Sequence, residues 1–338
     1  MKPFESHDRS ATSKDLDMAT LNIIRYSKVS DAIAQGKASL KEQREYNTNH
    51  HGRAEILDVL PTLQHFEQQE QSWILLEPWL DLIMSSQGLM KTNVHRIRLP
   101  GAFLVQLLHA SRLGLQMGHL SLDDMEDLAK DFPKQTTGGD SLEESINSAI
   151  FFVRLDTCSL KDALIGSGHI KSVTDIWTRL ATSARGMQGI TDLRKEDPST
   201  PILIYLLPWK DDIRTELEYR VYCSPGGKLA AVSQYHWHSP WYHAAAARQE
   251  QETICQRLLA NCEVVHKKIM AHPEMTDVLR SRGFVFDVVE DPGTQTVKLI
   301  ELNDFGALSG CGSCLFHWVK DAMLLYGFEK QVEVRVTA

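Results

Sequence analysis

Three polar residues lie in two apolar segments near the end of the sequence. Asp287 interrupts the hydrophobic run 284–289, and Glu301 and Asn303 stand two residues apart at the end of the run 297–303. If the second run is a strand, Glu301 and Asn303 project from the same face, because side chains alternate along a strand. Two carboxylates and an amide oxygen suit Mg²⁺ when phosphate oxygens and water complete its shell. The spacing therefore predicts a metal site, with strand-end residues that satisfy turns as the alternative.

Basic residues occur earlier in the sequence, and one of them, Arg154, lies in an apolar segment. Arg154 lies in the otherwise apolar run 150–155, and Lys161 and Asp162 follow it. A buried cation is costly unless an anion meets it. Arg154 is therefore a candidate for phosphate binding, while Lys161 and Asp162 could equally be solvated loop charges.

The segment Glu218-Tyr219-Arg220-Val221-Tyr222 alternates in polarity. As a strand it places Glu218 and Arg220 on one face and aromatic and apolar residues on the other. Such a strand borders either water or a polar cleft. The apolar strand expected over 202–207 is ended by Pro208, so main-chain groups at its end could read an adenine edge within the segment 202–209, although a core strand explains the segment equally well.

Two further motifs are weaker. His236 and His238 stand two residues apart without a third ligand at metal spacing, so packing or a substrate-contacting aromatic wall is favoured over zinc. Cys311 and Cys314 have the spacing of a redox pair, but neighbouring glycines favour a loop over the site. An acyl-carrying thiol is the remaining alternative.

The elements that position these residues predict an α+β fold. Residues 1–18 are expected to be disordered, and 19–141 to form a mostly helical region with a helical pattern from Leu16 to about Gln69. The region 142–338 is predicted to hold antiparallel strands packed with long helices. Expected strands cover 150–155, 202–207, 217–223, 229–234, 284–289 and 297–302, and expected helices cover 102–115, 142–149 and 254–269, with another starting near 121.

Composition sets broad limits. The net charge of -8 provides no overall attraction to nucleic acid, although a local basic cleft could still exist. Six cysteines among 338 residues are too few for a disulfide scaffold. The sequence has no membrane-spanning run and no apolar signal core, so we expect a cytoplasmic protein without a membrane partner.

The order of these segments resembles the cell division cycle protein 123 family. Each motif is short, but together they span about residues 70–328 in the family's order. The matching segments are 92–108, 154–163, 203–209, 218–222, 229–234, 286–287, 299–305 and 316–318.

The resemblance implies an ATP-grasp fold, with ATP and Mg²⁺ held between two β-rich lobes. It implies a metal site of carboxylates and an amide, phosphate-binding cations, and an adenine hinge. The metal ligands would be Asp287, Glu301 and Asn303, and the nucleotide would meet Arg154, Lys161, Asp162, Leu206, Leu207, Trp209, Glu218 and Arg220. Asp287, Glu301 and Arg220 would then be the catalytic candidates.

The sequence departs from the family pattern at telling positions. Arg154 stands where the family has lysine, Glu301 where it has aspartate, and Tyr235 where it has arginine. Arginine changes a point cation into a planar fork. The side chain of Glu301 is one methylene longer than that of aspartate, so a metal site with Glu301 cannot keep the family's coordination geometry without adjustment. We therefore expect a divergent branch of the family.

The resemblance leaves three functions. Family orthologues are ATP-binding assembly chaperones for translation initiation factor two, a role that involves its gamma subunit. ATP-grasp enzymes activate a carboxylate with ATP and join it to an amine. Fungal relatives include arginine-containing cyclodipeptide synthases that use aminoacyl-tRNA. We favour an amide-bond-forming enzyme, a ligase or a peptide-bond-forming transferase, which takes a small-molecule or amino-acid substrate and a nucleotide or the terminal adenosine of tRNA. The non-enzymatic chaperone is the alternative.

Overall fold

A computed structural model describes residues 19–38, 45–49, 51–59, 74–166 and 168–338. The prediction for residues 1–18 lies outside this described part. The described chain forms two compact units. One contains 212–338 with the described residues up to 74, and the other contains 75–211. The predicted division at residue 141 therefore runs through the second unit.

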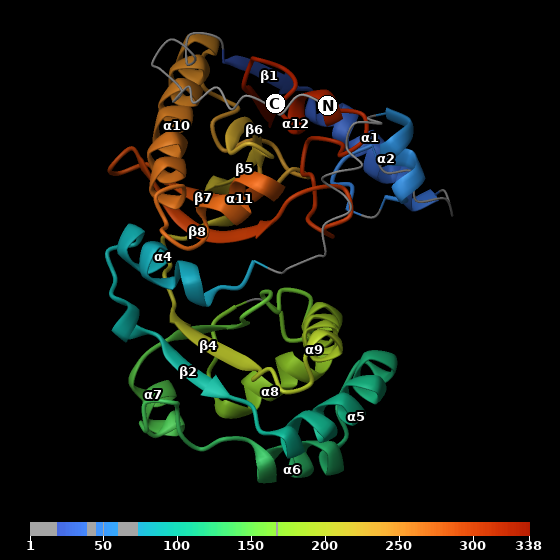
Figure 1. The fold of residues 1–338 in the computed structure, drawn as a ribbon, viewed down its shortest axis with the longest axis vertical. Coiled ribbons are helices and arrows are strands. Elements are labelled where there is room, and N and C mark those ends of the chain that lie inside the picture. Colours follow the sequence, from blue (N-terminus) through green and yellow to red (C-terminus); the bar gives the residue numbers. More distant parts are fainter. Residues whose placement is uncertain (1–18, 39–44, 50, 60–73, 167) are drawn as a thin grey trace, which may run out of the picture. The chain divides into compact units, whose positions relative to one another are not determined.

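The first unit is built on a six-stranded sheet (Figure 1). Its order is β1-β9-β6-β5-β7-β8, in which β9 runs parallel to both neighbours and the remaining pairs are antiparallel. The bounds are β1 (Thr20–Ile24), β5 (Glu218–Ser224), β6 (Lys228–Gln234), β7 (Phe284–Asp291), β8 (Thr296–Asp304) and β9 (Glu333–Thr337).

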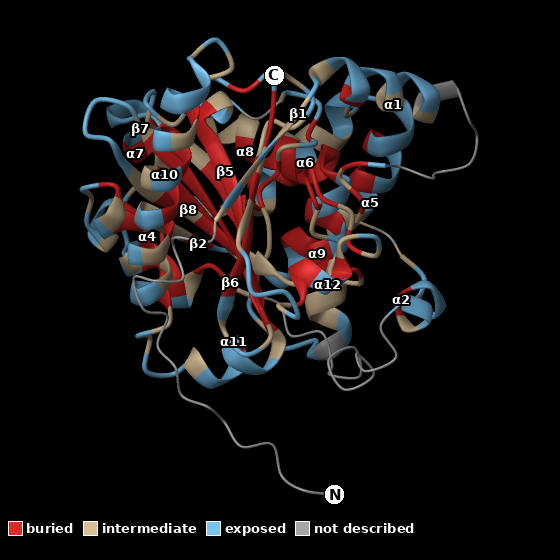
Figure 2. Ribbon diagram, turned by 90° about the horizontal axis from the view of Figure 1, so that it is seen from above, coloured by how far each residue is buried: buried red, intermediate tan, exposed pale blue. Residues whose placement is uncertain are grey.

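Helix α10 (Arg248–Ile269) packs on this sheet. Its buried residues repeat every three or four positions, which aligns them along one face of the helix. The central strands are almost fully buried, whereas much of α1 is exposed (Figure 2). The other helices of the unit are α1 (Tyr26–Ala38), α2 (Arg53–Val59), α11 (Thr276–Arg282) and α12 (Ala322–Leu325), with a 3-10 turn η5 (Thr215–Leu217).

The second unit has a three-stranded antiparallel sheet, β2-β4-β3. Its strands are β2 (His95–Arg98), β3 (Phe151–Leu155) and β4 (Leu203–Pro208). One face packs into an apolar core with residues of the helices. The helices are α4 (Leu80–Ser86), α5 (Gly101–Met117), α6 (Leu122–Asp131), α7 (Leu142–Ser148), α8 (Val173–Thr182) and α9 (Ala184–Glu196), with 3-10 turns η3 (Glu77–Trp79) and η4 (Lys91–Asn93).

Side-chain caps explain where several of these helices begin. Ser121, Ser172 and Ser183 each accept a hydrogen bond from a main-chain N–H of the first turn of α6, α8 and α9, respectively. This bond satisfies a donor that has no partner within the helix. Helix α5 ends at Gly118, whose φ of 73° is left-handed.

The mixed α+β class and all six predicted strands are confirmed, as are the helices now seen as α5, α6, α7 and α10. The helical prediction from Leu16 is wrong over Thr20–Ile24, which forms β1. Its pairing partner β9 lies at the other end of the chain, so local periodicity could not reveal it. Strand β2 was also missed. No described helix is both long and apolar enough to cross a membrane.

Candidate functional site

Arg220, Asp287 and Glu301 lie side by side across three strands of the first unit. Arg220 on β5 stands opposite Asp287 on β7, which stands opposite Glu301 on β8. Directly opposed residues share a sheet face, so the three side chains form one line. All three are buried, at 6%, 1% and 6% exposure. The sequence identified these residues but not that they are neighbours.

Arg220 and Asp287 form a bidentate ion pair. Arg220 donates from Nε to Oδ1 of Asp287 at 2.8 Å and from Nη2 to Oδ2 at 2.7 Å. Burial works against the charged guanidinium, but the neighbouring carboxylate outweighs it and raises the pKa of Arg220 well above its usual value. The ring of Tyr235 lies 4.9 Å from the guanidinium carbon. Paired in this way, the charges of both buried residues are compensated.

This pairing bears directly on the predicted metal site. Asn303 donates from its amide nitrogen to Oδ2 of Asp287 at 3.2 Å, so that oxygen accepts from two side chains. These three hydrogen bonds occupy three of the roughly four lone-pair positions of the carboxylate, so Asp287 retains little capacity for Mg²⁺ while it is paired with Arg220. Within the described residues, no group of three or more His, Cys, Asp or Glu side chains is arranged to hold a metal ion. The donor types suit magnesium, but the ion pair with Arg220 competes with metal binding by Asp287. Metal binding by Asp287, Glu301 and Asn303 stays a prediction.

The line of polar residues continues across the whole sheet. Arg220 stands opposite Ser233 on β6, Ser233 opposite Arg335 on β9, and Arg335 opposite Asn22 on β1. We call this set, from Asn22 to Glu301, the polar row. The sequence analysis missed its outer half, although Glu333-Val-Arg335-Val repeats the Glu-x-Arg-Val alternation of β5.

Residues 311–318, which we call the crossing loop, connect the two halves of the polar row. Arg220 donates from Nη1 to the carbonyl oxygen of Gly312 at 2.7 Å, and Arg335 donates to that of Leu315 at 3.4 Å. Between them, the main-chain N–H of Leu315 donates to Ser233 Oγ at 3.1 Å. The loop is thereby anchored at three points of the row.

The two cysteines of the crossing loop are free thiols. Burial raises the pKa of Cys311 to about 12 and that of Cys314 to about 11, although Arg220 acts in the opposite direction. The thiolate is the reactive form of cysteine, so both groups are poor nucleophiles here. The loop interpretation is therefore favoured over redox or acyl-carrying chemistry.

Glu218 lies two residues before Arg220 and shares its sheet face. It is 4% exposed. With Glu218 included, this end of the face holds three carboxylates, and the register from Glu218 through Val289 places Lys298 on the same face as a second cation besides Arg220. His236 and His238, in contrast, pack edge-to-face with ring centroids 4.3 Å apart and belong to no described metal cluster.

A second polar alignment lies in the second unit. Arg154 on β3 stands opposite Tyr205 on β4, which stands opposite Arg96 on β2. Arg154 is 5% exposed and donates from Nε to the carbonyl oxygen of Leu155 at 3.2 Å. Arg96 pairs with Glu77 through bonds of 2.9 and 3.0 Å. Sequence reasoning missed Arg96 because β2 itself was missed.

Asp162 has a structural partner. Its carboxylate accepts from Ser183 Oγ at 2.5 Å and from the main-chain N–H of Arg185 at 3.0 Å, at the start of α9. It therefore completes a helix cap. Lys161 lies beside it in the loop after β3 and is half-buried. Phosphate binding by Arg154, Lys161 and Asp162 stays a prediction.

The predicted adenine hinge lies at the end of β4. Leu206 faces the apolar core and its main chain is paired with strands on both sides. Leu207 lies one residue beyond the last pair with β2, at Leu206. Trp209 donates from its main chain to Ile150 and from its indole to Asp211. From Leu207 onward, β4 extends past its last residue pair with β2. A hinge that reads an adenine edge would require main-chain groups at such a position.

Comparison with known proteins gives the following matches. A sequence profile of the D123 family matches residues 168–337, which is 170 of the 338 residues. The solved structure of Cdc123 from Schizosaccharomyces pombe is similar at a TM-score of 0.51 and 14% identity, covering 85% of this chain and 98% of that chain. A C-terminally truncated Cdc123 from the same organism gives a TM-score of 0.52 at 15% identity, covering 78% and 95%. No curated protein matches. At these identities the likeness shows the fold, a mixed α+β, ATP-grasp-like arrangement with two sheets.

Proposed function

This chain belongs to the D123 family, and from that premise we propose that it is an amide-bond-forming enzyme that uses aminoacyl-tRNA. In this proposal the terminal adenosine of tRNA takes the place that ATP would take in an ATP-grasp ligase. The products would be dipeptides, including cyclic ones. An arginine-containing cyclodipeptide is the expected product if the chain follows the fungal branch that its sequence resembles.

The ion pair between Arg220 and Asp287 carries this proposal. A ligase that forms an acyl phosphate relies on metal-bound ATP, and Asp287 is the acid that the family resemblance assigns to the metal. Here both of its oxygens accept hydrogen bonds from Arg220. An aminoacyl ester is already activated, so an enzyme that uses it needs no acyl phosphate. The departures at Arg154 and Glu301 agree with a branch that keeps the fold but changes the chemistry.

The proposed reaction is aminolysis of an ester. The α-amine of one aminoacyl group attacks the ester carbonyl of another, a C–N bond forms, and the C–O bond to the first ribose breaks, which leaves a dipeptidyl ester on the second tRNA. In a second aminolysis the free amine of this dipeptidyl group attacks its own ester carbonyl, the C–O bond to the second ribose breaks, and the cyclic dipeptide is released. The amine loses a proton and the departing ribose oxygen gains one. We assign Glu301 to orient the substrate ammonium group and accept its proton, because it extends the row of acids on this face. Arg220 and Asp287 act as positioning residues.

The test is to incubate the purified protein with amino acids under two conditions and to measure new dipeptides by mass. One reaction contains ATP and Mg²⁺, and the other contains charged tRNA. Product only with charged tRNA supports the proposal. ATP-dependent product without tRNA would replace it with a ligase, and no product under either condition would overturn the enzymatic proposal.

A pair of variants assigns the role of Glu301. Glu301→Gln keeps the shape of the side chain and is expected to lower the rate about 10²–10⁴-fold, the usual contribution of a general base. Glu329→Gln, at an exposed position of the same unit, is the matched control and should leave the rate unchanged. Equal rates for both variants would remove Glu301 from the mechanism.

The second candidate function is a non-enzymatic chaperone that assembles translation initiation factor two. The likeness to Cdc123 over 98% of that chain supports it. Purified gamma subunit of the factor distinguishes the two functions. Stoichiometric binding of the gamma subunit without dipeptide formation supports the chaperone, and dipeptide formation without such binding supports the enzyme.

A further inference from the structure

A pocket of about 410 Å³ lies in the first unit, at the Arg335 end of the polar row. Its walls come from the β1–α1 junction, from Glu45 and Tyr46, and from the crossing loop and the residues after it. The volume falls in the range of sites that hold small ligands. The lining of this pocket does not include Glu218, Arg220, Asp287 or Glu301.

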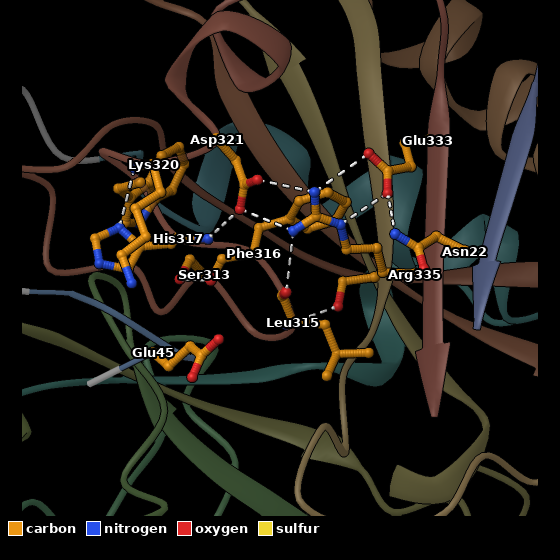
Figure 3. Close-up of polar contacts among 12 residues, drawn as sticks. Asn22, Glu45, Ser313, Leu315, Phe316, His317, Lys320, Asp321, Glu333 and Arg335 are labelled. Carbon is orange, nitrogen blue, oxygen red and sulfur yellow. Dashed lines mark hydrogen bonds and ion pairs between the residues drawn. The ribbon is translucent and has the colours of Figure 1, made fainter. Parts of the chain in front are cut away.

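Arg335 lines this pocket and is held by polar contacts to its neighbours (Figure 3). It donates to both oxygens of Asp321 at 2.8 Å and to both oxygens of Glu333 at 2.9 and 3.2 Å. Its guanidinium carbon lies 4.1 Å from the centroid of the Phe316 ring. Because all its nitrogen atoms already donate, Arg335 shapes the pocket and leaves ligand binding to other cations.

Those other cations surround the pocket. Arg25, Lys28 and Lys320 line it and are exposed. Lys28 lies 3.8 Å from Glu45, a distant contact between two exposed groups that contributes little. Across the described ranges, neither Arg25 nor Lys320 forms an ion pair with a carboxylate. The lining holds four Arg or Lys and two acids, Glu45 and Asp321. When Glu333, which pairs with Arg335, is counted as well, an excess of one positive charge is left.

Helix α1 adds to this positive character. Its first turn contains no acid, although the N-terminal end of a helix carries partial positive charge. Arg25 lies directly before the helix and Lys28 lies in its first turn. Each cation at this end is repelled by the partial positive charge of the helix end. The main-chain N–H of Tyr26, the first residue of the helix, already donates to the main-chain oxygen of Ala338 at 2.7 Å, so the side chains of Arg25 and Lys28 would supply the direct contacts to an anion.

We propose that this pocket binds a phosphate-bearing ligand. Arg25, Lys28 and Lys320 would contact the phosphate oxygens, and the N-terminal end of α1 would add its dipole. The buried residues Tyr46 and Leu315 supply an apolar wall for the rest of the ligand. The phosphate could belong to a small molecule or to the backbone of a tRNA. The site is independent of the amide-bond chemistry proposed above.

Calorimetric titration with inorganic pyrophosphate tests the site at constant ionic strength. The pocket variant is Lys28→Gln/Lys320→Gln, and the matched control is Lys267→Gln/Lys268→Gln on the exposed side of α10. Both remove two positive charges from exposed positions. We expect pyrophosphate to bind the wild type and the control equally, and the pocket variant at least about tenfold more weakly. Added salt should weaken the wild-type binding.

Competition identifies the source of the phosphate. Displacement of pyrophosphate by ATP and not by uncharged tRNA supports a small-molecule ligand, and displacement by tRNA supports a nucleic-acid phosphate. Equal pyrophosphate affinity of the pocket variant and the wild type would overturn the proposal, as would no binding to the wild type. These measurements need no turnover, so their failure would leave the amide-bond proposal intact.

Discussion

Arg220 and Arg335 have similar surroundings at two positions of one polar row, with Ser233 between them. Each follows a glutamate by two residues on its strand and precedes a valine. Each donates two hydrogen bonds to an aspartate and one to a carbonyl of the crossing loop. Each also has an aromatic ring within 5 Å of its guanidinium carbon, Tyr235 in one case and Phe316 in the other.

Their depth differs. The side chains of Arg220 and Asp287 are 7% and 1% exposed, whereas those of Arg335 and Asp321 are 15% and 20% exposed. A deeply buried pair cannot lose one partner without leaving an uncompensated charge, whereas water can reach a shallow pair. The same Glu-x-Arg-Val pattern therefore forms a buried ion pair at Arg220 and part of the lining of an open pocket at Arg335.

The largest expected effect comes from breaking the deep pair. Arg220→Met leaves Asp287 buried without its cation and should lower the free energy of unfolding by about 3–5 kcal/mol. Denaturant unfolding measures this loss. The double variant Arg220→Met/Asp287→Leu should recover most of it, because both charges are then absent. A loss below about 1 kcal/mol for the single variant, the value of an exposed pair, would show that depth does not distinguish the two arginines.

Breaking the shallow pair should cost less. Arg335→Met removes hydrogen bonds to Asp321 and Glu333, but both carboxylates can then be hydrated. We expect a loss of about 1–2 kcal/mol in the free energy of unfolding, in the same denaturant experiment. Lys28→Gln, which changes charge at the same pocket without breaking a buried contact, is the control. If Arg335→Met costs as much as Arg220→Met, the comparison fails.

A third effect, no larger than that of Arg335→Met, should depend on pH and arise near Arg335. Burial, with a smaller effect from His51, lowers the pKa of His317 from 6.5 to about 4. Its Nδ1 accepts from the main-chain N–H groups of Val319 and Lys320, both at 3.2 Å, which requires that nitrogen to be unprotonated. The neutral ring therefore stabilises the fold above pH 6.5, and that stability is lost as pH falls from there towards about 4.

Because His317 is partly exposed, the expected loss is about 1–2 kcal/mol rather than the full linkage value. Unfolding free energies measured from neutral to about pH 5 should fall in the wild type and fall less in His317→Gln. Parallel pH curves for the two proteins would assign the dependence to other groups.

Local patterns predicted much of the fold. Apolar runs and alternation of polarity identified strands β3 to β8, and the three- and four-residue spacing from Ile254 identified α10. These signals are local because the period of side chains is a property of one element. Strand β1 escaped because its short run is mixed in polarity and gains stability from β9, more than 300 residues away.

The site shows the same division. Arg220, Asp287, Glu301 and Asn303 were identified as site candidates because each is a polar residue in an otherwise apolar strand. Such a residue needs a partner, which is either a ligand or another side chain. In β9, Arg335 follows Glu333 by two residues and precedes a valine, which is the pattern of Glu218, Arg220 and Val221 in β5. This similarity is a local signal for Arg335.

The sequence by itself determined which residues break the hydrophobic pattern and which faces they share along each strand. The tertiary structure decided their partners. Arg220 and Asp287 are 67 residues apart, and only the pairing of β5 with β7 sets them opposite each other. A carboxylate on a strand can bind a metal or a guanidinium equally well in principle. The choice depends on which group the neighbouring strand presents within hydrogen-bond distance, and that is a property of strand order and register.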